Sequence, residues 1–262
     1  MAINNINMRR ISFAILLLLL APHSYAYKTF RFLGAESPKA IKIRNDFLSR
    51  VDLKSLEVSG NLCVGIGNVE TFDGCDEAYW FLAPVNSHLK VPGFSLFDSP
   101  SPEAIADILS RVRSKPRVGI IRDKTESQFV DELDGSIQKK GGKLIKIDYQ
   151  DDIGKSLIGL ESESVEILFV QTSSIFADNI RQVLESLGRR RIIVVSTIRG
   201  ADRIGASVVE TGDIDTALEE FIEIMRAGKD RKDKNFLKSS STTINKGLIE
   251  LYDIQLSKDG KQ

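Results

Sequence analysis

The fold is decided by residues 117–147, which read RVGIIRDKTESQFVDELDGSIQKKGGKLIKI. The short apolar run at 118–121 is typical of a buried strand. Apolar side chains then recur at helical spacing over 127–139, Gly141 and Gly142 end that pattern, and a second strand is predicted at 144–147. A strand, a helix and a further strand in this order predict a parallel sheet with helices packed on its faces.

The same alternation extends toward the C-terminus. Apolar strands are predicted at 165–170, 192–195 and 206–209, with helices at 153–160, 177–187 and 214–227. Each strand is almost entirely apolar, so we expect both faces of this sheet to be covered. We assign these elements to a C-terminal α/β lobe, residues 116–238.

The first half of the chain is less regular and predicts a second, smaller α/β lobe at 27–115. Its expected strands are 29–33, 62–66, 78–85 and 94–97, and its expected helices are 38–51 and 103–112. Residues 239–262 form a final segment that we expect to cross back to this lobe. The predicted fold class is therefore α/β, with two doubly wound parallel-sheet lobes.

Residues 1–26 have the three parts of a cleavable secretory signal peptide. Arg9 and Arg10 precede a largely apolar run of eleven residues at 11–21, and small residues flank Tyr25 at 24–26. The alternative is a membrane anchor, but eleven helical residues are too short for a hydrocarbon core of about 30 Å. We expect a periplasmic protein with no stable membrane insertion after cleavage.

Charge and motif content exclude several functions. Cleavage removes Arg9 and Arg10 and no acidic residue, leaving 34 basic against 36 acidic side chains, so no nucleic-acid partner is expected. The chain has no G-x-S-x-G, H-E-x-x-H or phosphate-loop motif, and His88 is the one histidine of the mature part. We predict no catalytic residues, no cofactor and no metal site.

The two cysteines, Cys63 and Cys75, lie twelve residues apart with turn-forming residues between them. In an oxidising compartment this spacing predicts a disulfide, and the alternative is a metal or redox pair.

Three segments resemble a known family. They are 117–124 (RVGIIRDK), 167–174 (ILFVQTSS) and 192–197 (IIVVST), supported by 205–207 and 211–213 further on. They resemble the periplasmic solute-binding proteins of ABC transporters, and more narrowly the subfamily that includes aromatic amino-acid binders. The likeness covers about the last 170 residues well and the first part of the mature chain poorly. The family has a further strand–helix unit after the first helix, whereas here only residues 52–61 are available, so the first lobe is reduced.

The resemblance implies an extracytoplasmic binding protein that delivers a small polar, possibly amino-acid-like ligand to an ABC permease. The alternative is an orphan periplasmic module that signals to a membrane sensor or another partner without transport. The reduced first lobe favours the alternative, because docking on a permease uses both lobes.

Candidate ligand-binding residues follow the strands, because ligands bind at the carboxyl ends of strands in doubly wound sheets. They are Gly34, Ser37, Gly67, Asn68, Asp123, Thr125, Thr172, Ser173 and Ser196. Thr172 and Ser173 lead this set, although hydroxyl groups at such positions also cap helices. Trp80 either stacks on a ligand ring or packs in the core.

The processing site gives a first prediction: the exported protein begins at Tyr27. Intact-mass measurement of the soluble periplasmic form would show the loss of residues 1–26, and a mass that retains them would contradict the signal peptide.

Overall fold

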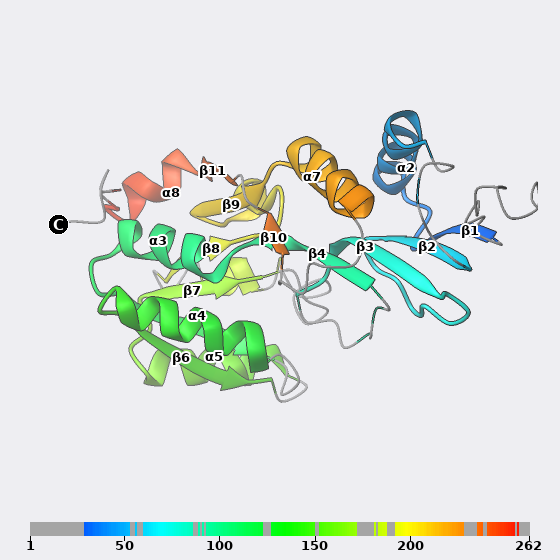
Figure 1. The fold of residues 1–262 in the computed structure, drawn as a ribbon. Helices are drawn as coiled ribbons and strands as arrows, with labels where there is room; N and C mark the ends of the chain where they lie inside the picture. The colour runs from blue at the N-terminus through cyan, green and yellow to red at the C-terminus, as the bar shows by residue number, and fades with distance from the viewer. Residues whose placement is uncertain are drawn as a thin grey trace, which may run out of the picture.

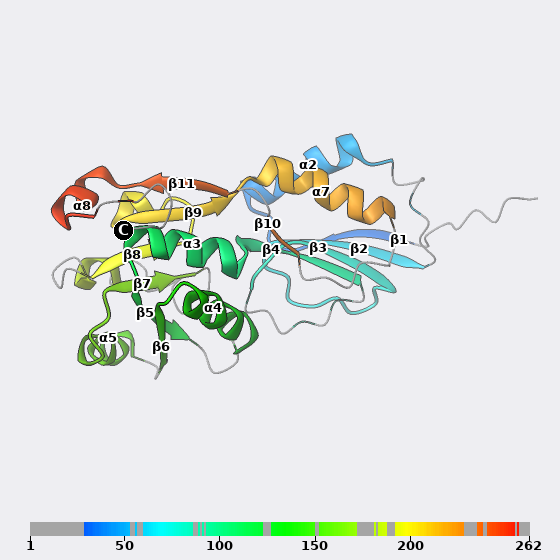
Figure 2. The same cartoon turned by 60° about the vertical axis from the view of Figure 1, so that its left-hand side comes forward.

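The computed structural model describes residues 29–52, 56, 60–85, 89, 91, 93–122, 127–149, 152–171, 181, 183–187, 192–227, 235–237, 240–254 and 256. The chain forms two sheets that lie side by side along its length, each with its own core (Figures 1 and 2). The predicted signal peptide lies outside the described residues.

The second lobe is built on the six-stranded sheet β11-β9-β8-β7-β5-β6. Its strands are β5 (Arg117–Arg122), β6 (Lys143–Asp148), β7 (Ile167–Val170), β8 (Ile193–Ser196), β9 (Val208–Gly212) and β11 (Ser240–Ile244). All are parallel to their neighbours except β11, which runs antiparallel to β9. The stretch 117–147 forms β5, helix α4 (Ser127–Lys139) and β6, with β5 paired to β6 in parallel as predicted.

Helices cover both faces of this second sheet. Helices α3 (Pro102–Val112) and α4 pack on one face, where Leu109 and Leu133 are fully buried. Helix α5 (Ile153–Ser162) and the described helical residues 183–187 cover the other face.

The first lobe has the five-stranded parallel sheet β1-β2-β3-β4-β10. Its strands are β1 (Thr29–Leu33), β2 (Asn61–Ile66), β3 (Glu77–Ala83), β4 (Gly93–Pro100) and β10 (Asn235–Leu237). Helices α2 (Pro38–Arg50) and α7 (Ile214–Ala227) lie together over one face of this sheet (Figure 1).

Phe221 of α7 is the centre of the first lobe's core. Its ring centroid lies 5.0 Å from that of Phe81, and three more rings lie within 6.5 Å, those of Phe47, Tyr79 and Phe94. Phe221 is fully buried. A helix that is far from β1–β4 in the sequence therefore closes the core of their lobe.

The packing differs from the predicted division of the chain at three points. Helix α3, expected in the first lobe, packs on the second sheet, whereas α7 and β10, expected in the second lobe, pack on the first sheet. The closing segment does not cross back, because β11 pairs with β9, and helix α8 (Lys246–Leu251) follows it on the second lobe. The sequence pattern shows that these elements have an apolar face, but not which sheet that face covers.

Among the described residues, the other face of the first sheet is covered by loops rather than by helices. Strand β2 leads to the parallel strand β3 through residues 67–76, and β3 leads to β4 through 84–92. Parallel strands are usually joined by a longer crossover that contains a helix. Here Phe72 and Val69 from the first of these loops pack over Trp80 and Cys63 instead.

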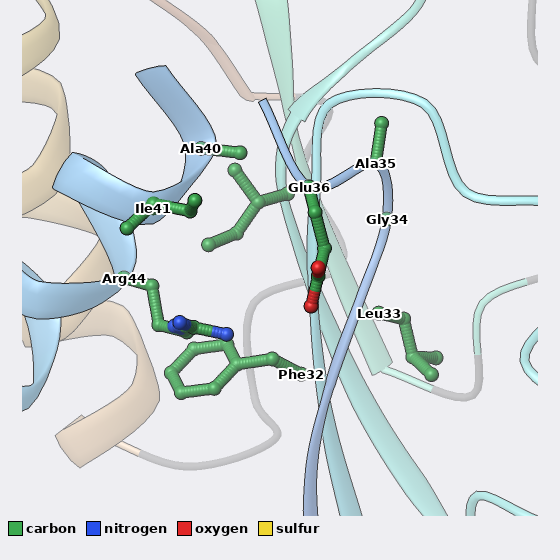
Figure 3. Close-up of a pocket in the computed structure, with 9 residues that line it drawn as sticks. Phe32, Leu33, Gly34, Ala35, Glu36, Ala40, Ile41 and Arg44 are labelled. Atoms are coloured by element: carbon green, nitrogen blue, oxygen red, sulfur yellow. The ribbon is translucent and has the colours of Figure 1, made fainter. Parts of the chain in front are cut away.

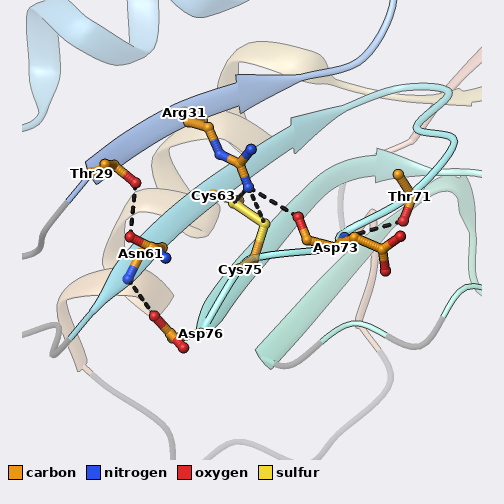
Figure 4. The surroundings of a disulfide bond; sticks show 8 residues. All are labelled: Thr29, Arg31, Asn61, Cys63, Thr71, Asp73, Cys75 and Asp76. Atoms are coloured by element: carbon orange, nitrogen blue, oxygen red, sulfur yellow. Dashed lines mark hydrogen bonds between the residues drawn. A yellow bond between two sulfur atoms is a disulfide. The ribbon is translucent and has the colours of Figure 1, made fainter.

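The predicted disulfide between Cys63 and Cys75 is confirmed (Figure 4). The two Cα atoms are 5.9 Å apart, so the bond ties the end of the loop 67–76 to β2. Within the described ranges, no helix is both long and apolar enough to cross a membrane.

The aromatic core predicts the effect of removing one ring. Phe221→Ala should lower the free energy of unfolding of the first lobe by about 3–5 kcal/mol, because it leaves a cavity between four other rings. Urea unfolding followed by Trp80 fluorescence would measure this loss. Glu223→Ala, on the exposed side of the same helix, is the matched control and should change stability by no more than about 0.5 kcal/mol.

Candidate functional site

A pocket of about 190 Å³ lies at the carboxyl ends of the first three strands of the first lobe, beside the N-terminus of α2. It is lined by Ala35, Ser37, Lys39, Ala40, Ile43, Ile66, Gly67, Asn68, Leu82 and Asp98. A smaller pocket of about 60 Å³ adjoins it and shares Ala35, Ala40 and Ile66 (Figure 3). Carboxyl ends of parallel strands are where doubly wound sheets bind ligands, so the location agrees with the fold.

The turn after β1 is shaped by glycine and by a helix cap. Gly34 has a φ of 121°, and a Cβ atom at this position would lie 2.4 Å from the carbonyl oxygen of Ile66, so a larger residue does not fit. Ser37 is the N-cap of α2, where its Oγ accepts a hydrogen bond from the backbone N–H of Ala40 at 3.1 Å. The backbone thus brings the N-terminus of α2 against the pocket.

A bulge at the end of β3 forms another wall. Leu82 has a φ of 55°, and the pairing of β3 with β4 shifts register between Phe81 and Ala83. Because of this bulge, Leu82 packs in the same core as Phe81 and reaches the pocket. A leucine with positive φ is an uncommon, strained conformation of the kind that clusters at binding sites.

Two charged side chains line this pocket, and a charge of the second lobe acts on one of them. Asp98 of β4 and Lys39 of α2 line it, and Arg199 follows β8 in the second lobe. Burial raises the pKa of the Asp98 carboxyl above its ordinary value of 3.8, while the positive charges of Lys39 and Arg199 act in the opposite direction. The guanidinium of Arg199 donates to the carbonyl oxygen of Gly212 at the end of β9, which holds it at the carboxyl edge of the second sheet.

The smaller pocket carries a second pair of opposite charges. Glu36 and Arg44 both line it, next to the ring of Phe32 (Figure 3). It extends the polar surface of the larger pocket toward β1.

Two buried hydroxyl groups of the second lobe, those of Thr197 and Ser207, have no hydrogen-bond partner among the described residues. Thr197 comes directly after β8 and is 5% exposed, and its Oγ1 is buried without a partner. A buried hydroxyl in this state retains its capacity to bind a ligand atom.

Four of the nine residues predicted from the sequence lie together at these pockets. Ser37, Gly67 and Asn68 line the larger pocket and Gly34 lines the smaller one. Ser196 is buried, and its Oγ donates to the carbonyl oxygen of Val170 and accepts from the N–H of Ile198, so it closes a turn. Asp123, Thr125, Thr172 and Ser173 lie outside the described residues.

Sequence reasoning missed the charged residues and the bulge. Asp98 lies just beyond the strand predicted at 94–97, and an acidic residue that ends an apolar run was the available signal. No sequence pattern marked Lys39 or Arg199 as candidate binding residues, because single cationic side chains are common at helix starts and in turns. Among the described residues, no three His, Cys, Asp or Glu side chains gather as a metal site.

Comparisons with known proteins bear on the fold. No protein-family model matches the sequence, and no curated protein matches it. The ABC domain from Streptococcus pneumonia, solved in complex with L-Trp, aligns with a TM-score of 0.61 at 15% identity over 88% of this chain and 95% of that one. A conserved domain protein from Vibrio cholerae aligns with a TM-score of 0.60 at 14% identity, covering 89% and 97% of the two chains.

A ligand-free, open substrate-binding protein with adhesive properties from Clostridium difficile is also similar. Its TM-score is 0.56 at 12% identity, covering 88% of this chain and 96% of that one. A putative LacI transcriptional regulator from Bacteroides fragilis is similar as well, with a TM-score of 0.51 at 9% identity, covering 86% of this chain and 99% of that one. At these identities the likeness defines the fold, which is the periplasmic-binding-protein-like α/β class with two mostly parallel sheets.

The environment of Asp98 predicts a pH dependence of stability. Its carboxyl has a raised pKa in the folded protein and therefore keeps its proton to higher pH than in the unfolded chain. Ionisation of Asp98 therefore lowers the free energy of unfolding at pH values above the folded-state pKa. At pH values below the ordinary pKa of 3.8 the carboxyl is protonated in both states, and this loss is absent. The difference in free energy of unfolding between Asp98→Asn and wild type should therefore shift in favour of the variant as the pH rises from about 3 to about 7. Urea unfolding at both pH values would measure this shift. A constant difference, or a gain toward low pH, would contradict the buried carboxyl.

Proposed function

We propose that this protein is an exported solute-binding protein that takes up a small polar ligand between its two lobes. The observation that carries the proposal is the pocket at the carboxyl ends of the first sheet, which Asp98 and Lys39 line. The positive charge of Arg199 from the other lobe also acts on the Asp98 carboxyl. A charge of the second lobe that acts on a residue lining this pocket allows a bound ligand to stabilise a closed arrangement of the lobes. Among similar structures, an open, ligand-free substrate-binding protein supports a fold that opens and closes.

The pocket chemistry fits an amino-acid-like ligand. A ligand ammonium group would bind the carboxylate of Asp98, and a ligand carboxylate would bind Lys39 and Arg199 near the N-terminus of α2, where the helix dipole favours negative charge. The similar ABC domain was solved with L-Trp, which carries both groups. Ile43, Ile66 and Leu82 supply an apolar wall for a side chain.

Delivery to an ABC permease is the proposed role of the loaded protein in the periplasm. The features in favour are the signal-peptide pattern at 1–26 and the fold shared with substrate-binding proteins. We propose no catalytic activity.

A second candidate is a periplasmic binding module that signals to a membrane sensor without transport. The observation in its favour is the reduced first lobe, in which loops take the place of helices on one face of the sheet. Deletion of the gene distinguishes the two roles, because loss of ligand uptake indicates transport and unchanged uptake with an altered response indicates signalling.

The decisive experiment is a thermal-shift screen of the mature protein against amino acids, nucleosides and small carboxylates. A compound present at about 100 times its Kd should stabilise the fold by roughly 2.7 kcal/mol. A complete absence of shifts over these classes would count against the proposed function.

The pocket charges predict the effect of one substitution on a compound found in that screen. Asp98→Asn keeps the shape of the side chain and removes its charge, so affinity for a compound with an ammonium group should fall about 10- to 150-fold. Isothermal titration calorimetry would measure the loss. Glu185→Gln, an exposed site on the second lobe, removes the same charge away from the pocket and should leave affinity unchanged.

A further inference from the structure

The only tryptophan of the chain, Trp80, is hydrogen-bonded to a residue of the pocket wall from the opposite face of the sheet. Trp80 lies on the loop-covered face of the first sheet and is 2% exposed. Its indole Nε1–H donates a hydrogen bond of 2.7 Å to the carbonyl oxygen of Gly67, which lines the pocket. The backbone N–H of Gly67 in turn donates to the carbonyl oxygen of Phe81 at 2.9 Å. Gly67 is therefore held on both sides by β3, in a left-handed conformation with a φ of 64°.

Residues 67–75, the pocket loop, are held at their far end as well. The disulfide ties Cys75 to Cys63 in β2, and Arg31 of β1 donates to the carbonyl oxygen of Asp73 at 3.0 Å (Figure 4). A guanidinium nitrogen of Arg31 also lies 3.5 Å from the sulfur of Cys75.

The middle of the pocket loop packs directly on the sheet. The ring of Phe72 lies 5.2 Å from that of Trp80, and both contact the space above Gly65. A Cβ atom at Gly65 would lie 2.9 Å from Phe72 and from Val69, so these two loop side chains pack directly against the backbone of β2. The pocket loop has no helix or strand of its own, which leaves these contacts to fix its course.

We propose that Trp80 and the Cys63–Cys75 disulfide are positioning groups for the pocket, which together hold the wall formed by Gly67 and Asn68. They support the pocket loop where a crossover helix would otherwise lie. The proposal rests on the pocket described above as the binding site. Its consequence is that the wall keeps its binding shape in the oxidised protein and loses it when the disulfide is reduced.

The test is hydrogen–deuterium exchange of the mature, ligand-free protein, with and without tris(2-carboxyethyl)phosphine. Reduction should speed exchange of the Gly67 amide by about 10-fold or more, because a cross-link over a loop of this size is lost. Amides of β5 in the second lobe and of residues 62–64 in β2 should keep their protection. The fluorescence emission of Trp80 should shift to longer wavelength in the same samples, because its ring becomes more exposed to water when the pocket loop no longer packs on it.

A second variant isolates the hydrogen bond and does not depend on reduction. Trp80→Phe keeps an aromatic ring against Phe72 and removes the Nε1–H donor, so the Gly67 amide should exchange about 3- to 10-fold faster. Phe169→Leu, a buried substitution in the second lobe, is the control for general destabilisation and should leave that amide unchanged.

The outcomes separate this inference from the proposed function. Equal exchange of the Gly67 amide in oxidised and reduced protein, or a rise spread evenly over the first lobe, would overturn the positioning role. Neither measurement uses a ligand, so a screen that finds no binder would contradict the proposed function and leave the exchange result standing.

Discussion

The parallel pairing of β1 to β4 is the constraint on which the rest of the structure depends. Strands that run in one direction bring all their carboxyl ends to one edge, and the turns after β1, β2 and β3 therefore meet there. The pocket is the space between these turns and the start of α2. Parallel pairing also requires every connection to return along a face of the sheet, and this requirement decides how each face is covered.

On one face the requirement is met by helices, and one of them comes from far along the chain. Phe221 of α7 packs among aromatic side chains of α2, β3 and β4. The core of the first lobe is therefore complete only when α7 is packed on it. The chain passes between the lobes after β4, after β9 and after β10. Three such passages connect the two lobes through several segments of the chain.

On the other face the returning segments are too short for helices. The pocket loop and its disulfide cover this face in their place, and Trp80 joins them to the pocket wall. A reduced lobe thus retains a defined pocket because a covalent bond and a few buried contacts replace a layer of helix. The charges at the pocket add a second link between the lobes, since Arg199 acts on Asp98 across the junction.

The sequence by itself determined most of the elements and their parallel arrangement, and it singled out four residues that line the pockets. Strand and helix periodicities around 117–147 and at 214–227 matched the observed elements, the cysteine spacing predicted the disulfide, and Gly34, Ser37, Gly67 and Asn68 were found by their position after strands. These features follow from local patterns, because a residue's period and its neighbours decide whether it turns, caps or faces a core.

Only the tertiary structure decided which sheet each helix covers and which distant charges act on Asp98. Helices α3 and α7 have equally clear apolar faces, yet each packs on the sheet opposite to the one its place in the sequence suggests. Asp98 and Arg199 are about one hundred residues apart and carry no mutual signature, and the bulge at Leu82 depends on how β3 meets β4. The physical reason is that burial and Coulomb energies depend on distances in space. A sequence pattern shows that one face of a helix is apolar and will be buried, but it does not show which sheet that face packs against.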